Sequence, residues 1–511
     1  MGPPGEWTDA GGYEPSAPRG CPRRLRARHD GGHRADVERS PAVTVTIGSR
    51  ADLSIAAVRR VAWEGEAVTL APAVVERMER GHEAFAAFVA ARLAEDPGAL
   101  LYGVTTGPGD AGAAVLSDEA RATRPRGLWT GASFGEPLPE RVVRAIVLAR
   151  LANLVDGHAG ARPSVAEAVA GMLGGEPLPA VPARGNGGSG EILALGRLFG
   201  PLAEALELEP REKMALINGS PCAAALVTDA ALAGRGRLEL AERTFALSVE
   251  AILAPLEAFD PALGALWGDP HEAAALASLS ALLADGAPGR PEHQGPVSHR
   301  VLPRVLGRVR EAQAQAERTG ATALASVTDN PVFLPPSAAR PLGALISNGG
   351  YHNDRAHPAL DALAHAWADL AQLAQRHVDK LFQHPVSGPP LSGEWKAKPL
   401  HMVAAGYAEE ARTLAQTTVL GLGAFGQNDL PSPAFLAWGK AVAVGTCLDR
   451  TLAVLAALGA EVLHAAGRPV PPALAPFVGE IRAAFPPIDT PRPLGPDAER
   501  LAAAFGRRVH P

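Results

Sequence analysis

Cysteine is scarce in this sequence, and the paired patterns that mark many metal sites are missing. The 511 residues contain only Cys21, Cys222 and Cys447, whose spacing suggests no disulfide framework, so we expect a reduced, cytoplasmic protein. No CxxC or HExxH pattern occurs among these cysteines and the 15 histidines. Without such ligand spacing the sequence predicts no metal site.

An excess of basic residues is also missing, because the formal net charge is −6. This charge argues against a nucleic-acid-binding protein. The one basic stretch, 23–28, lies in a leader rich in proline and glycine, residues 1–42, which we expect to be disordered. The leader has no apolar segment typical of a secretory signal, and charges such as Asp449 and Arg450 interrupt later apolar runs, so no membrane-spanning helix is expected.

Aromatic residues make up only 5% of the chain, whereas hydrophobic residues together reach 47%, with alanine and leucine abundant. This bias favours helices packed through small side chains. Apolar residues recur at helical spacing over 236–253, 355–383, 402–420 and 438–466, as in long antiparallel bundle helices. We therefore predict a mainly α fold, with a smaller, mixed N-terminal domain at 43–221 and a long-helix bundle at 222–511.

Shorter patterns occupy the expected N-terminal domain. The alternation from Val43 to Ile47 predicts a short strand. Asp52 precedes an apolar run at helical spacing and is the expected N-cap of that helix. A further helix is expected over 142–154, and the segment 100–135 is expected to be loop.

Glycine is densest at 185–190, Gly-Asn-Gly-Gly-Ser-Gly, directly before a helical pattern from Glu191. Taken alone, this stretch is compatible with a tight turn that caps the helix. A phosphate-binding loop is disfavoured, because the lysine of a Walker loop is missing. A third interpretation is chemical: the amide nitrogen of Gly190 can attack the carbonyl carbon of Gly188. Loss of two waters, one carrying the Ser189 hydroxyl, then leaves a methylidene-imidazolone electrophile.

The loop and six further stretches resemble the histidine, phenylalanine and tyrosine ammonia-lyase family. That family has Ala-Ser-Gly-Asp where this chain has Gly-Ser-Gly-Glu at 188–191. The further matches follow the family's order and are Tyr-Gly-Val-Thr-Thr-Gly at 102–107, Ala-Leu-Ile-Asn-Gly-Ser at 215–220, Gln294 to Arg300, Thr-Asp-Asn-Pro at 328–331, Tyr351-His352 and Gln427-Asn428-Asp429. The resemblance covers roughly residues 43–435 and implies the long-helix fold of the family.

The resemblance also implies a self-generated cofactor, 4-methylideneimidazole-5-one, made from Gly188, Ser189 and Gly190, with no metal or diffusible cofactor. Tyr102 would be the base that removes the β-proton. Because an ordinary tyrosine has a pKa of about 10, we expect positive potential from helix N-termini to lower it.

Further roles follow from the same matches. Arg300 would clamp the substrate carboxylate in a bidentate pair. Asn218 would hydrogen-bond the ring or the substrate. The residues expected to bind the substrate are Trp129, Thr130, Tyr351, Gln427 and Asn428.

Several positions differ from the family's pattern. Val297 stands where the family has a second tyrosine, and valine cannot move a proton. Either another group substitutes, with Tyr351 or His299 as candidates, or the chemistry differs from that of the family. Thr105 replaces an asparagine, and Ala323 replaces an acidic residue. The segment Trp129-Thr130 lacks the histidine of the histidine and tyrosine branches, so the sequence does not support free tyrosine or histidine as substrate and leaves phenylalanine-like or modified amino acids open.

The resemblance implies an ammonia-lyase that converts an aromatic or related α-amino acid into an α,β-unsaturated acid. A 2,3-aminomutase of the same family is an alternative, because it would use the same ring. A divergent member without the ring, either a dehydratase-like enzyme or a helical binding protein, is a further alternative. The family also implies a homotetramer in which several chains contribute to each site, with a small amino acid as the only other partner.

Overall fold

A computed structural model describes residues 44–107, 109–117, 119–120, 127–291, 294–392, 397–421, 423 and 426–510. Val43–Pro511 make one compact unit. The expected leader, residues 1–42, lies outside the described residues. The expected domain boundary at 222 stays a prediction, although a long helix begins beside it, at Pro221.

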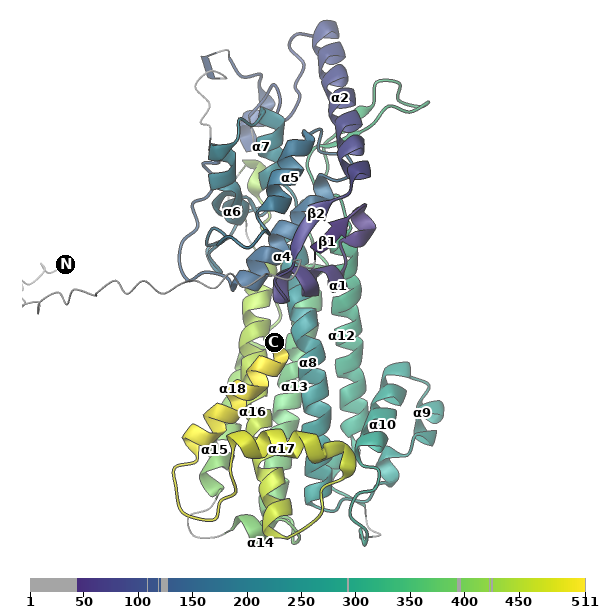
Figure 1. The fold of residues 1–511 in the computed structure, drawn as a ribbon, viewed down its shortest axis with the longest axis vertical. Coiled ribbons are helices and arrows are strands. Elements are labelled where there is room, and N and C mark those ends of the chain that lie inside the picture. The colour runs from purple at the N-terminus through teal and green to yellow at the C-terminus, as the bar shows by residue number, and fades with distance from the viewer. Residues whose placement is uncertain are drawn as a thin grey trace, which may run out of the picture. The chain divides into compact units, whose positions relative to one another are not determined.

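The mainly α fold is confirmed, and five long helices form its bundle (Figure 1). They are α8 (Pro221–Ala251), α12 (Leu302–Leu324), α13 (Ala356–Gln383), α15 (Lys398–Leu414) and α16 (Ala434–Ala465). Helix α13 packs on α12, α15 and α16, and α8 packs on α12, α13 and α16. The apolar repeats at 355–383 and 438–466 therefore correspond to buried helices.

Helix α8 begins fifteen residues before the predicted start at 236. The prediction considered only a stretch without internal glycine, whereas two glycines lie inside the helix. A Cβ on Gly234 would lie 2.1 Å from Oε1 of Gln313, and one on Gly236 would lie 3.0 Å from the backbone of Val509. These glycines allow close helix packing and do not end the helix. Helix α15 ends at Leu414, short of the predicted 420.

The N-terminal part begins with the predicted strand, β1 (Thr44–Ile47), which pairs in parallel with β2 (Ala67–Leu70). The expected N-cap at Asp52 is wrong. Ser54 caps α1 (Ile55–Val58) by accepting from the amide of Ala57 at 3.2 Å. The Asp52 carboxylate instead accepts from the amides of Gly48 and Ser49 and so closes the preceding turn.

The remaining elements are mostly short, apart from the 24-residue helix α2. In the N-terminal part they are η1 (Arg50–Asp52), η2 (Arg59–Trp63), α2 (Pro72–Glu95), η3 (Gly109–Ala113), α4 (Glu140–Arg150), η4 (Leu151–Asn153), α5 (Pro163–Gly171), α6 (Ile192–Ala205) and α7 (Pro210–Ile217). Around the bundle they are η5 (Glu257–Phe259), α9 (Ala262–Trp267), α10 (Pro270–Leu282), α11 (Val297–Arg300), β3 (Val332–Leu334), β4 (Ala344–Ile346), α14 (Gly388–Leu391), η6 (Gly426–Asn428), η7 (Pro472–Leu474), α17 (Ala475–Ala484) and α18 (Gly495–Val509).

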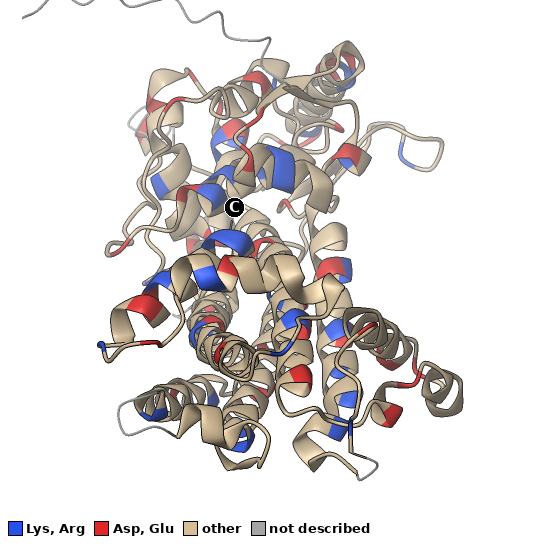
Figure 2. Ribbon diagram, turned by 60° about the horizontal axis from the view of Figure 1, so that its bottom comes forward, with Lys and Arg blue, Asp and Glu red and all other residues tan. Residues whose placement is uncertain are grey.

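Two segments, Pro210–Ala251 and Ala434–Ala465, are long and apolar enough to cross a membrane. Their most apolar windows are 100% and 78% buried inside the structure, as in the core helices of a folded bundle. Acidic and basic residues are interspersed over the helices (Figure 2). Asp449 of α16 is buried and pairs with Arg237 of α8 at 2.9 Å, so this charge stays within the protein core.

Candidate active site

The glycine loop has an unusual backbone at three of four consecutive residues. Gly188 and Gly190 have φ values of 95° and 75°, and Glu191 has a φ of 57°. Such positive values favour glycine, because a Cβ clashes there with the backbone. Ser189 lies between the two glycines and is buried. Helix α6 begins immediately afterwards, at Ile192, as the sequence predicted.

Glu191 fixes the end of this loop on the start of α8. Its carboxylate accepts from the amides of Cys222 at 2.6 Å and Ala223 at 2.7 Å. These amides lie in the first turn of α8, where backbone donors have no partner within the helix. Burial raises the pKa of Glu191 to about 7, although the two amide donors lower it. The extra methylene of glutamate, relative to the aspartate of the family's motif, still allows this contact.

Asn218 and Tyr351 lie beside Gly190. A Cβ on Gly190 would lie 3.5 Å from Oδ1 of Asn218 and 3.5 Å from Cδ2 of Tyr351. Asn218 ends α7 and donates from Nδ2 to the carbonyl of Asn330 at 2.5 Å. Two of the predicted site residues therefore lie next to the loop that carries Ser189.

Hydrogen bonds from the Thr-Asp-Asn-Pro motif and from buried arginines stabilise the segment around Asn218. The Thr328 hydroxyl accepts from the amide of Ser220 at 3.0 Å, and the Asp329 carboxylate accepts from the buried Arg211. Arg150 is fully buried and donates to the carbonyls of Ala215 and Asn218. Sequence reasoning missed Arg150 and Arg211, because neither belongs to a motif and a lone arginine in a helix gives no indication of burial.

Tyr102 lies in a loop that folds over its ring. Its hydroxyl accepts from the amide of Gly109 at 2.8 Å, and a Cβ on Gly112 would lie 2.9 Å from the ring. Burial raises the pKa of Tyr102, the Gly109 amide lowers it, and the nearby Tyr351 raises it. The expected lowering by helix N-termini is therefore wrong within a single chain, where the net shift is upward.

Thr105 has a structural role in the same loop. Its hydroxyl accepts from the amide of Leu101 at 2.8 Å and donates to the carbonyl of Ala99 at 2.7 Å. Thr105 is buried, so its side chain is committed to the turn.

Asn428 connects the loop of Tyr102 with Ser189. Its Oδ1 accepts from the Ser189 hydroxyl at 2.9 Å, and its Nδ2 lies 3.6 Å from where a Cβ on Gly109 would be. Gln427 precedes it in η6. Four residues beyond Asn428, the amide of Ser432 donates to the carbonyl of Gly188 at 3.3 Å. The structure thus gathers the loops of Tyr102, Ser189 and Asn428 with Asn218 and Tyr351.

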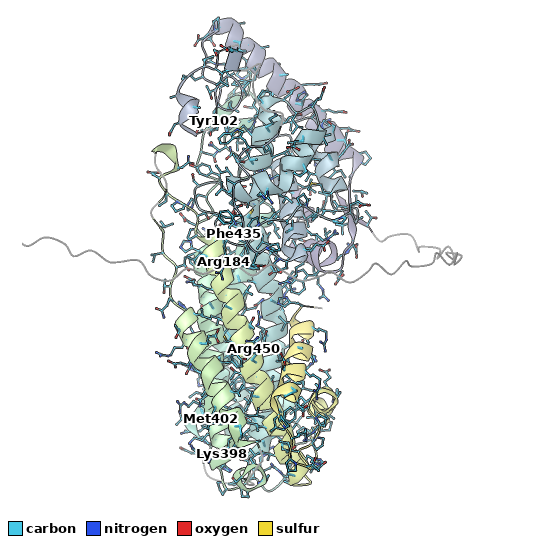
Figure 3. The ribbon with its side chains drawn as sticks, turned by 90° about the vertical axis from the view of Figure 1, so that its left-hand side faces the viewer. Tyr102, Arg184, Lys398, Met402, Phe435 and Arg450 are labelled. Atoms are coloured by element: carbon cyan, nitrogen blue, oxygen red, sulfur yellow. The ribbon has the colours of Figure 1, made fainter. Side chains whose placement is uncertain are left out.

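Arg300 lies elsewhere in the chain. It belongs to α11, whose Ser298 carbonyl accepts from Nε2 of His377 at 3.0 Å. His377 is near the C-terminal end of α13, whereas Tyr351 precedes the N-terminal end of that helix. The 21 residues from 356 to 377 span roughly 30 Å of helix, at about 1.5 Å per residue. Figure 3 shows Tyr102 in the N-terminal part, in the upper part of the view, and Lys398, the first residue of α15, near the lower end of the bundle.

The two candidates for the missing tyrosine differ in position. Val297 itself is 62% exposed on α11. His299 is buried and stacks on His377 with ring centroids 3.7 Å apart, and burial lowers its pKa well below the usual range. Within one chain, Tyr351 is therefore the candidate that lies near Ser189. Ala323 is part of the last turn of α12.

Thr130 lies against α6, and Trp129 precedes it. A Cβ on Gly196 would lie 2.3 Å from Oγ1 of Thr130, so Thr130 packs directly on the helix backbone. Trp129 is 71% exposed in a single chain.

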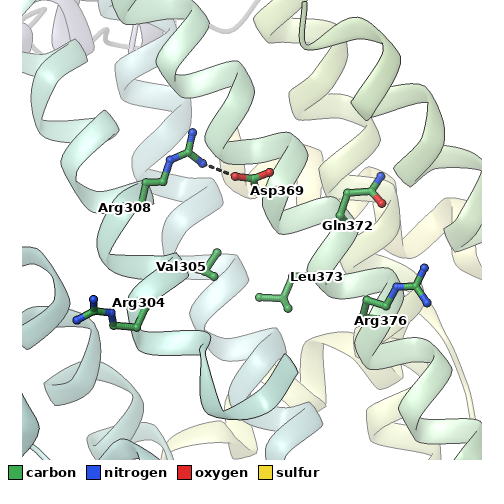
Figure 4. A pocket seen from close by; sticks show the side chains of 7 residues that line it. All are labelled: Arg304, Val305, Arg308, Asp369, Gln372, Leu373 and Arg376. Atoms are coloured by element: carbon green, nitrogen blue, oxygen red, sulfur yellow. Dashed lines mark hydrogen bonds and ion pairs between the residues drawn. The ribbon is translucent and has the colours of Figure 1, made fainter. Parts of the chain in front are cut away.

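A pocket of about 420 Å³ lies between α12 and α13, apart from the predicted site residues (Figure 4). Arg308 and Asp369 form an ion pair across it. The residues that line it are Arg304, Val305, Arg308, Asp369, Gln372, Leu373 and Arg376.

A model of the aromatic amino acid lyase family matches residues 53–204 and 203–484. The histidine ammonia-lyase of Anaeromyxobacter sp. (strain K) is 32% identical over 379 residues, which are 66% of this chain and 72% of the relative. That of Symbiobacterium thermophilum is 30% identical over 491 residues, 88% and 95% of the two chains. The chain therefore belongs to the aromatic amino acid lyase family, as the motifs predicted. It is a carbon–nitrogen lyase of the kind that acts on amino acids as an ammonia-lyase or an aminomutase.

Solved structures agree on the fold. The phenylalanine aminomutase of Pantoea agglomerans superimposes with a TM-score of 0.81 at 18% identity, covering 91% of this chain and 100% of that one. The histidine ammonia-lyase of Trypanosoma cruzi gives 0.76 at 21% identity, with 91% and 95% covered.

Proposed function

We propose that the chain eliminates ammonia from an aromatic or related α-amino acid to give an α,β-unsaturated acid. The reaction would use 4-methylideneimidazole-5-one formed from Gly188, Ser189 and Gly190. The observation that carries the proposal is the gathering of Tyr102, Asn218, Tyr351 and Asn428 around this loop, from four distant parts of the sequence.

The loop fits the proposed group in its backbone and its surroundings. Both glycines adopt positive φ values, and no heavy atom lies within 4 Å of a Cβ built on Gly188, so the loop has room to rearrange. Gly190 carries no side chain that would hinder its nitrogen. When formed, the group supplies an uncharged electrophile that takes up the amine of the substrate.

The chain's own residues supply the remaining functions. Tyr102 would remove the β-proton, with the Gly109 amide stabilising its phenolate. Because burial raises the pKa of Tyr102, its activation requires a positive group, and none among the described residues of one chain contributes to its pKa. Asn218 would donate a hydrogen bond to the ring or the substrate, and Tyr351, Gln427 and Asn428 would line the pocket.

We propose that Arg300 reaches the site from a second copy of the chain and clamps the substrate carboxylate there. The separation of roughly 30 Å along α13 supports this, because Arg300 cannot approach Ser189 of its own chain without unfolding the bundle. A homotetramer with shared sites, in the cytoplasm, is the assembly we propose. In that assembly the exposed Trp129 and the neighbouring Thr130 would lie at the substrate side chain.

The substrate is proposed to be phenylalanine-like or a modified amino acid, because Trp129-Thr130 offers no histidine. Histidine is the comparison substrate, since the curated relatives are named histidine ammonia-lyases. A 2,3-aminomutase remains the second candidate, and it would yield a β-amino acid in place of the unsaturated acid.

Mass spectrometry tests the proposal directly. Trypsin cleaves after Arg184 and Arg197, so peptide 185–197 isolates the loop. We expect this peptide to lack two waters, and we expect the purified protein to release ammonia and an unsaturated acid from phenylalanine or a relative. Ser189→Ala should restore the unmodified mass of the backbone and abolish turnover. An unmodified peptide from folded parent protein would favour the ring-free family member.

A further inference from the structure

Two oxygen atoms of the glycine loop are held by one short segment of the chain. The carbonyl oxygen of Gly188 accepts from the amide of Ser432 at 3.3 Å. The hydroxyl of Ser189 donates to Oδ1 of Asn428 at 2.9 Å. Both partners lie in residues 428–432, which run from the last residue of η6 toward the start of α16, and we call this stretch the clamp segment.

These two oxygens are the ones that ring closure expels. The Gly190 nitrogen bonds to the Gly188 carbonyl carbon, and its proton passes to the carbonyl oxygen. That oxygen leaves as water with the proton of the Ser189 amide, which creates a carbon–nitrogen double bond. The Ser189 hydroxyl leaves as a second water with the Cα proton, which creates the methylidene. No oxidant or reductant is needed.

We propose that the clamp segment promotes ring closure, with the Ser432 amide acting on the Gly188 carbonyl and Asn428 orienting the Ser189 hydroxyl. This inference rests on the proposed function, because it concerns how the ring of that site arises. Negative charge develops on the Gly188 oxygen as the Gly190 nitrogen attacks. A backbone donor fixed beside that oxygen stabilises the charge without reorganising, as in an oxyanion hole.

The local sequence fixes the donor. Ser432 lies between Pro431 and Pro433, whose rings restrict the backbone on both sides. Helix α16 begins two residues later, and the partial positive charge of its N-terminal end favours negative charge nearby. The Ser432 hydroxyl has no hydrogen-bond partner in the described part of the chain, so its backbone amide is the group that contacts the loop.

The role is confined to maturation. Once both oxygens have left, neither hydrogen bond exists, so the Ser432 amide does not contribute to turnover through them. Loss of the Ser432 amide proton should therefore reduce the fraction of chains that carry the ring. Chains that do carry the ring should keep their activity.

The decisive variant is Ser432→Pro, which removes the amide proton, and Ser432→Ala is its matched control, which removes only the hydroxyl. The readout is the fraction of peptide 185–197 that lacks two waters, followed over time after purification. We expect maturation of the Ser432→Pro chain to slow by at least about tenfold, because removing one oxyanion donor costs about 10²–10³ in rate at a well-formed site. Ser432→Ala should mature like the parent, and Asn428→Ala should also slow the loss of water.

Maturation of a folded Ser432→Pro chain at the parent rate would overturn the inference. If circular dichroism shows that this variant does not fold, an ester bond in place of the amide at 432 provides the same test with the side chain retained. An ester chain that matures at the parent rate would overturn the inference equally. A parent chain that never loses water would instead reject the proposed function, so the two failures are distinguishable.

Discussion

At the scale of single residues, the backbone at 188–191 decides which side chains the loop tolerates. Gly188 has space around it but a φ of 95°, whereas the neighbouring Gly187 has equal space and no positive φ. The two glycines therefore differ in backbone strain but not in the space available to a Cβ. This contrast separates the need for a small residue from the need for glycine's conformational freedom.

Gly188→Ala should destabilise the loop by about 1–2 kcal/mol, because the added Cβ meets the backbone at positive φ. We also expect slower loss of water from peptide 185–197. Gly187→Ala is the control and should change the free energy of unfolding little. Equal behaviour of the two variants in chemical denaturation would show that backbone strain at Gly188 is unimportant.

At the scale of elements, the start of α8 is held by a carboxylate from another part of the chain. Glu191 receives the amides of Cys222 and Ala223 and thereby couples the glycine loop to a buried helix of 31 residues. The motif Ala-Leu-Ile-Asn-Gly-Ser ends at Ser220, directly before that helix. Loop and helix therefore adopt their positions together.

Glu191→Gln should alter how stability depends on pH. Because the folded pKa of Glu191, about 7, exceeds its ordinary 4.5, the parent has the full stabilising contribution below pH 4.5. That contribution is lost as the pH rises through about 7, and the total change is roughly 3 kcal/mol. Glutamine does not titrate, so the difference in free energy of unfolding between variant and parent should shift by that amount across the window. A constant difference would contradict the raised pKa.

At the scale of the whole molecule, the chain carries its predicted catalytic residues at two ends of one helix. Tyr102 and Ser189 lie near the N-terminal end of α13, and Arg300 lies near its C-terminal end. The proposed site is therefore complete only when another copy provides Arg300.

Mixed assemblies test this arrangement. Chains with Tyr102→Phe and chains with Arg300→Ala should each have little activity alone. Coexpressed in equal amounts, they should recover about a quarter of the parent activity, because a site draws an intact Tyr102 from one chain and an intact Arg300 from another by chance. Ammonia release from the copurified assemblies measures this. Activity no higher than that of the separate variants would mean that the two residues do not meet in a shared site.

Sequence motifs predicted the family and the residues near Ser189, because the residues of each motif are adjacent in the sequence. The spacing of apolar residues predicted the long helices. Motifs and spacing did not predict Arg150, Arg211 or the amide of Ser432, which act through burial or through the backbone. They also missed the start of α8, because the sequence does not distinguish a glycine that allows close helix packing from a glycine that ends a helix. The location of Arg300 depends on tertiary structure, which spacing along the chain does not reveal.

Under the proposal, the hydrogen bonds on Gly188 and Ser189 exist only in a chain whose ring has not yet closed. Under the proposed ring closure, the newly made chain and the mature chain differ by two waters that do not return on refolding. Denaturing the mature protein therefore leads to an unfolded state that the ribosome never produces. Refolding from it would proceed without the Ser432 and Asn428 contacts to these oxygens, so its rate would describe a different folding reaction from the one that first built the site.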